Sequence, residues 1–148
     1  MSDRASPASH AAALFEAGFS CAEAVAGAFA EHRGLGRDAA LRAAGAFGAG
    51  MSRTGQTCGA VSGALLVLGL VHGRTNAADG EAKERAYALG ARFCERFQAA
   101  NGGLSCPALL GVDISSPAVR KAAADAGLFK TRCPALVRSA AEILDAMI

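Results

Sequence analysis

The chain has 148 residues, of which 52% are hydrophobic and 19% are charged, and its formal net charge is +2. This composition excludes a disordered chain and predicts one globular domain with a substantial hydrophobic core. With one tyrosine, no tryptophan and no basic cluster, the chain also lacks the side chains that nucleic-acid binding needs. We therefore expect no nucleic-acid partner.

The N-terminal segment is polar and lacks the basic start and apolar run of a signal peptide. We expect a cytoplasmic protein with no membrane partner, organised as a single all-helical domain over residues 1–148. Residues 1–9 are expected to form a loose tail. Cytoplasmic thiols stay reduced unless they have a redox or metal-binding role, so the five cysteines do not indicate a secreted disulfide framework.

Three helices are expected before the centre of the chain, at residues 10–18, 21–32 and 37–47. The second has a capping box, in which Ser20 caps the helix and Glu23 reaches back to the Ser20 backbone. Residues 48–55 are rich in glycine and predict a flexible loop. A phosphate-binding loop is disfavoured because the Lys-Ser/Thr ending of a Walker motif is absent.

The next helix, at about residues 58–72, is apolar on nearly every side and should be the buried centre of the bundle. It is too short to cross a bilayer, which takes about 20 residues. Thr57 is the expected N-cap, and Gly73 the expected left-handed residue after its end. Small residues near Cys58, among them Gly59, Ala60 and Gly63, would let neighbouring backbones approach closely.

The remaining helices are expected at about residues 79–100, at 106–111 as a short turn, from Ser115-Ser116-Pro117 to near Gly127, and at 133–148. The long helix has one charged face, whereas Phe93 and Phe97 lie on its inward face. No stretch alternates polar and apolar residues with period two, as a half-buried strand would. The sequence therefore predicts an all-α fold.

Four cysteines are expected at helix starts: Cys21, Cys58, Cys106 and Cys133. Backbone N–H groups and the helix dipole favour negative charge there, so these thiols should have lowered pKa values. Cys94 lies inside the long helix and is interpreted as a packing residue. The alternative for all five is that they are small buried hydrophobic residues.

The cysteine spacings also exclude several familiar sites. The chain has no C-x-x-C pair, so thioredoxin-like and zinc-ribbon motifs are absent. It has no C-x-x-C-H sequence either, and covalent haem is therefore not expected.

The cysteine pattern resembles the C-GCAxxG-C-C family of redox-active proteins. Cys21, the segment Cys58-Gly59-Ala60-Val61-Ser62-Gly63, Cys106 and Cys133 match its motif, and the similarity extends over about residues 20–148. Thr57 departs from the glycine that many members carry. The resemblance implies an all-helical domain with the four cysteines at one site. It also implies association with electron carriers, since a similar module occurs in split-Soret-type cytochromes.

Several functions remain open. The first is an iron–sulfur cluster bound by Cys21, Cys58, Cys106 and Cys133, for electron transfer or sensing, with Gly59, Ala60 and Gly63 beside the cofactor. The second is cofactor-free dithiol/disulfide chemistry in which Cys58 attacks and another of the four resolves. A zinc site and a binding module with packing cysteines complete the list. We expect a redox partner protein, and a homodimer is left open. No substrate-turnover constellation is visible.

Overall fold

The computed structural model describes residues 5–148, and within these residues it is all-α, as the sequence predicts. The only β pairing recorded there is an isolated bridge between Thr57 and Ser105. The helices, in chain order, are α1 (Pro7–Glu16), α2 (Cys21–Arg33), α3 (Arg37–Ala44), α4 (Gly48–Arg53), α5 (Gly59–His72), α6 (Gly80–Asn101), α7 (Cys106–Leu110), α8 (Pro117–Asp125) and α9 (Leu128–Asp145).

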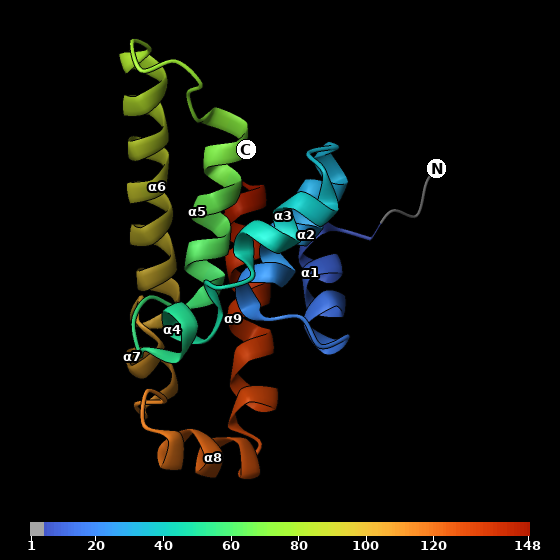
Figure 1. The fold of residues 1–148 in the computed structure, drawn as a ribbon, viewed down its shortest axis with the longest axis vertical. Helices are drawn as coiled ribbons and strands as arrows, with labels where there is room; N and C mark the ends of the chain where they lie inside the picture. The colour runs from blue at the N-terminus through green and yellow to red at the C-terminus, as the bar shows by residue number, and fades with distance from the viewer. Residues whose placement is uncertain (1–4) are drawn as a thin grey trace.

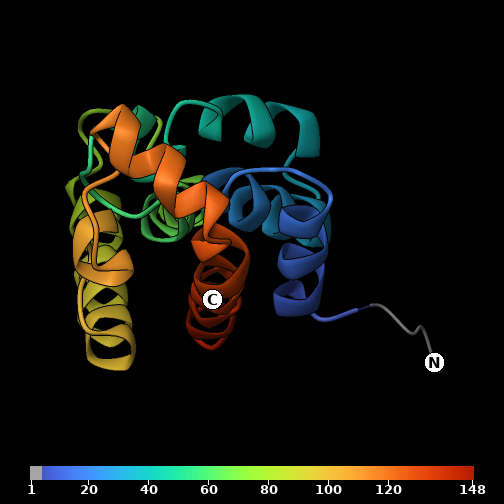
Figure 2. The same cartoon turned by 90° about the horizontal axis from the view of Figure 1, so that it is seen from below.

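The long helices form the body of the domain. α5, α6 and α9 lie side by side, while α1 and α2 pack on the other side of α5 and α9, and α3 packs on α2 (Figure 1). Seen from below, α8 crosses the end of the bundle and leads into α9 (Figure 2). The short helices α4, α7 and α8 thus lie at one end of the molecule.

The centre of the bundle is the contact between α2 and α5. A Cβ atom added to Gly63 would lie 2.7 Å from the carbonyl oxygen of Ala22, so only glycine allows this approach. Phe29 and Val25 of α2 are fully buried, as are Val61 and Val67 of α5. The prediction of a domain built around a buried central helix is confirmed. The last turns of α5 are less enclosed, and the Leu70 side chain is 47% exposed.

Several expected boundaries are also confirmed. In α2, the Glu23 N–H donates to Ser20 Oγ at 3.3 Å and the Ser20 N–H donates to Glu23 Oε1 at 3.0 Å, which completes the capping box. The bounds of α6 agree with the prediction to within a residue.

Helix α1 begins earlier than expected, at Pro7 with Ser6 as its cap, so residues 7–9 of the expected tail are helical. Residues 1–4 lie outside the described residues.

The ends of α5 and the start of α9 correct the sequence-based expectations. Cys58, not Thr57, is the N-cap of α5, because Thr57 is engaged in the bridge to Ser105. Gly73 has an extended backbone (φ −67°) rather than a left-handed one. α9 begins at Leu128 after left-handed Gly127, so Cys133-Pro134 lies inside the helix and does not open it.

The predicted loop at residues 48–55 is instead an ordered left-handed turn, and the helix before it ends at Ala44 rather than Phe47. Ala49, Gly50, Met51 and Ser52 all have positive φ, between 56° and 69°. Left-handed backbone costs non-glycine residues roughly 1–2 kcal/mol each. Local hydrogen bonds offset part of this cost. Ser52 Oγ donates to the Ala46 carbonyl at 2.5 Å, and the Gln56 N–H to the Gly50 carbonyl at 2.9 Å.

Candidate functional site

Cys58 and Cys106 are brought together by the bridge between the segments that precede α5 and α7. The Cys58 N–H donates to the Leu104 carbonyl at 2.8 Å, and the Cys106 N–H donates to the Gln56 carbonyl at 2.8 Å. These bonds fix two segments that lie almost fifty residues apart in the chain. Both cysteines lie at helix starts, as the sequence predicts for each of them, and these bonds place the two starts on the same side of the molecule.

Cys21 joins this pair because α2 and α5 begin next to each other. A Cβ atom on Gly59 would lie 3.2 Å from the Cβ of Cys21 and 3.0 Å from the backbone nitrogen of Ala22. Because Gly59, directly after Cys58, has no side chain, the first turn of α2 with Cys21 approaches the start of α5 closely. The capping box at Ser20 holds that first turn in place.

Cys133 reaches the same place from the second turn of α9. Its neighbour Arg132 donates from Nε to the Leu109 carbonyl at 3.0 Å, which ties α9 to α7. Cys133 is the sixth residue of its helix, beyond the first turn where the helix dipole acts. Its position in the site depends on the packing of α9 and not on a helix terminus.

All four cysteines line one cavity of 690 Å³ at the end of the bundle formed by α4, α7 and α8. Its walls are largely apolar and include Phe15 and Phe129. Within residues 5–148, three basic side chains and no acidic side chain line it. The basic side chains are Arg53, Arg120 and Lys121.

This convergence is accompanied by a match in sequence. Residues 19–147 match the model of a protein family described as "Putative redox-active protein (C_GCAxxG_C_C)". The chain belongs to this family. No curated protein and no solved structure matches it.

In this member of the C_GCAxxG_C_C family, three of the thiols are harder to ionise than free cysteine, which corrects the expectation from helix starts. Burial raises the pKa of Cys58 despite the Ala60 and Val61 N–H groups, which lower it. Burial and the neighbouring thiols raise the pKa of Cys106 to about 12. The pKa of Cys21 is raised well above its usual value, chiefly because its thiol hydrogen-bonds to Cys133 and is buried. Burial at Cys58 and Cys106, and the hydrogen bond to Cys133 together with burial at Cys21, therefore outweigh the helix-terminal effect.

The pKa of Cys133 is shifted in the opposite direction. The hydrogen bond from Cys21 lowers the pKa of the Cys133 thiol, and the positive charge of Arg132 lowers it further, against the opposing effect of burial. An S–H donor stabilises the thiolate that accepts from it, so the two shifts have one cause. Cys133 is the thiol of the four that ionises first.

The donor set fits an iron–sulfur cluster in number and kind, since such clusters are commonly held by four cysteine thiolates. In residues 5–148, however, no three Cys, His, Asp or Glu side chains are arranged to hold a single metal ion. A multi-iron cluster is larger than one ion and accepts ligands from a wider ring. Of the residues predicted beside the cofactor, Gly59 lines the cavity, and the Ala60 N–H is directed at Cys58; Gly63 contacts α2 deeper in the core.

Cys94 lies apart from the cavity. It is half-buried on α6, packs against the main hydrophobic core, and lines a separate shallow groove between α5 and α6. Its placement agrees with the packing role predicted from the sequence. No helix in the described part of the chain is long and apolar enough to span a membrane.

The basic and aromatic residues around the cysteines were not predicted as site residues from the sequence. Arg53 follows the glycine-rich segment, and Arg120 and Lys121 lie on α8 beside Pro117. Nothing in their local pattern separates them from solvated charges elsewhere. The one available signal was that Arg53 falls between the glycine-rich segment and the Cys58 motif.

Proposed function

We propose that the four cysteines form a redox centre that binds an iron–sulfur cluster for electron transfer or sensing. The observation that supports this most strongly is the convergence of Cys21, Cys58, Cys106 and Cys133, from four separate helices, on one cavity. A two-cysteine mechanism would leave two of these thiols without a role. When bound, a cluster would supply one-electron chemistry.

The pKa shifts support a role as ligands. The hydrogen bond to Cys133 and burial raise the pKa of Cys21, while burial and repulsion from neighbouring thiolates raise the pKa of Cys58 and Cys106. Metal ligands must be thiolates, and a bound cation removes the repulsion among them. A set of thiols whose ionisation is favoured by nearby positive charge suits a site that releases protons as it is loaded. Cys133, which ionises most readily, would be the first ligand.

The contact between Cys21 and Cys133 favours a second candidate, cofactor-free thiol–disulfide exchange. The Cys133 thiolate would attack a disulfide substrate, forming a mixed disulfide and expelling one thiolate. Cys21, after losing its proton, would attack the Cys133 sulfur, forming the Cys21–Cys133 disulfide and expelling the second thiolate. Two electrons pass from the protein to the substrate, which leaves as two thiols. The attacking thiol in this scheme is Cys133, whereas the sequence pattern favoured Cys58.

The test is anaerobic purification followed by an absorption spectrum and assays for iron, zinc and acid-labile sulfide. The cluster proposal predicts a brown protein with iron and sulfide in cluster stoichiometry. Serine at Cys21, Cys58, Cys106 or Cys133 should abolish the colour, whereas the matched control Cys94→Ser should retain it.

A colourless protein that cannot be reconstituted with iron and sulfide would overturn the cluster proposal. Formation of a Cys21–Cys133 disulfide on mild oxidation would then support the second candidate. Stoichiometric zinc without iron would contradict both.

A further inference from the structure

The cavity beside the cysteines has more room and a more specific lining than four sulfur ligands require. Its 690 Å³ falls within the range of small-molecule sites, roughly 300–1,000 Å³. Part of the cavity wall is apolar and contributes no ligand to a metal: it is formed by Phe15, Leu110, Ile114 and Phe129. Such a lining suits the apolar part of an organic molecule.

The charge of the lining is one-sided. Arg53 comes from the left-handed turn α4, and Arg120 and Lys121 come from α8, so the basic groups lie on two separate elements around the cavity. Lys121 pairs with Asp125 at 2.8 Å, but that carboxylate does not line the cavity. Arg120 donates to the Ile114 carbonyl at 3.1 Å, which anchors its guanidinium beside the wall. Positive charge in a concave apolar site attracts anions.

We propose that this cavity binds a small organic anion, with its apolar part against Phe15 and Phe129 and its negative group near Arg53 and Lys121. This deepens the proposed redox function, on which it rests, by naming the substrate class that reaches the cysteines. A carboxylate, sulfonate or phosphate group would satisfy the same basic side chains. The binding itself needs no metal and no change in the cysteines.

The experiment uses the full chain, reduced and free of metal, so that binding is measured independently of cluster assembly. The probe is 8-anilinonaphthalene-1-sulfonate, and the matched neutral probe is N-phenyl-1-naphthylamine, which has the same rings without the sulfonate. We expect one sulfonate probe per chain, bound about tenfold more tightly than the neutral one. Bound probe should also slow the alkylation of the cavity cysteines by iodoacetamide.

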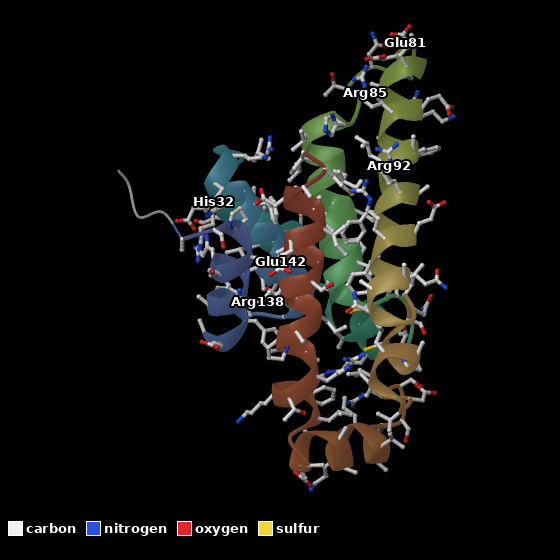
Figure 3. All side chains as sticks on the ribbon, turned by 180° about the vertical axis from the view of Figure 1, so that it is seen from behind. His32, Glu81, Arg85, Arg92, Arg138 and Glu142 are labelled. Carbon is white, nitrogen blue, oxygen red and sulfur yellow. The ribbon has the colours of Figure 1, made fainter. Side chains whose placement is uncertain are left out.

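Substitutions of basic side chains test whether the charge of the cavity accounts for the preference for the sulfonate probe. The double variant Arg53→Gln/Lys121→Gln should weaken sulfonate binding about fivefold to tenfold, as loss of two largely solvated charge contacts predicts. It should leave the neutral probe unchanged. The control Arg85→Gln removes an equivalent charge from α6, near the end of that helix remote from α7 and α8, and should change neither affinity (Figure 3). Added salt should weaken sulfonate binding to the unmodified protein in the same way, which provides a test without mutation.

Equal affinity for the two probes would overturn the proposal, as would an equal loss in the Arg85→Gln control. Sulfonate binding that leaves the cysteines fully reactive would place the probe elsewhere and would also overturn it. These outcomes are distinct from failure of the redox function. A protein that holds no cluster can still bind the anion, and a brown protein can fail to bind it.

Discussion

The contact between α2 and α5 and the cysteine cavity are adjacent, yet they are built in opposite ways. In the α2–α5 contact, defined by Ala22, Gly59 and Gly63, an added Cβ atom would lie within 3.0 Å of backbone. In the cavity, by contrast, larger side chains surround an open volume of 690 Å³. Cys21 and Cys58 lie at the boundary, since each begins a helix of the close contact and lines the cavity.

This difference separates two tasks. The close contact fixes where the two helices begin, and therefore where two of the four thiols lie. The cavity determines what can reach these thiols and how readily they ionise. Changes in the first region should act mainly on stability, and changes in the second mainly on chemistry.

The largest expected effect compares one substitution in the two regions. Phe29 of α2 is 1% exposed in the main core, whereas Phe129 is half-buried on the cavity wall. Phe29→Ala should lower the free energy of unfolding by about 3–5 kcal/mol, because it leaves a cavity in close-packed surroundings. Phe129→Ala should cost less than about 2 kcal/mol, because the removed ring already borders open space. Urea denaturation of the reduced protein measures both, and equal losses would contradict the distinction.

A smaller effect is expected within α5 itself. Gly63→Ala places a methyl group 2.7 Å from the Ala22 carbonyl oxygen and should destabilise the protein by about 1–3 kcal/mol. Gly69→Ala, six residues later, meets nothing within 4 Å and should stabilise the protein by about 0.5–1 kcal/mol through helix propensity. Thermal unfolding of the two variants provides the comparison. Stabilisation by both would show that α2 can move away from α5 at little cost.

The smallest effect is a shift in reactivity at one thiol of the cavity. The thiolate is the reactive form, and a lowered pKa keeps it populated at lower pH. Alkylation of Cys133, followed by mass spectrometry from pH 6 to 10, should therefore rise at lower pH than alkylation of Cys58 or Cys106. Cys21→Ala removes the hydrogen-bond donor and should move the Cys133 profile to higher pH.

The matched control for this measurement is Cys94→Ala, which lies outside the cavity and should leave the Cys133 profile unchanged. An unshifted Cys133 profile in Cys21→Ala would show that Arg132, rather than Cys21, sets its pKa.

Much of the fold is determined locally and could be predicted from the sequence. The capping box at Ser20 and Glu23, the length of α6 and the start of α7 at Cys106 follow from short-range hydrogen bonds and apolar periodicity. The all-α class and family membership follow in the same way from patterns read along the chain. The residues of the four-cysteine motif were identifiable for that reason, although their function stays a proposal.

Only the tertiary structure decided how these residues meet. The bridge between Thr57 and Ser105 joins segments distant in sequence. α9 extends through Cys133 and Pro134 because its first turn packs through Leu128 and Phe129 against the cluster around Cys106 and Ile114. The sign of each thiol's pKa shift also depends on neighbours that no local pattern specifies. The helix starts alone predict lowered pKa values, but desolvation by surrounding helices reverses that prediction for Cys58 and Cys106. For Cys21 the hydrogen bond to Cys133 reverses it, together with burial. Burial is a property of the whole fold, whereas a helix cap is a property of a few consecutive residues.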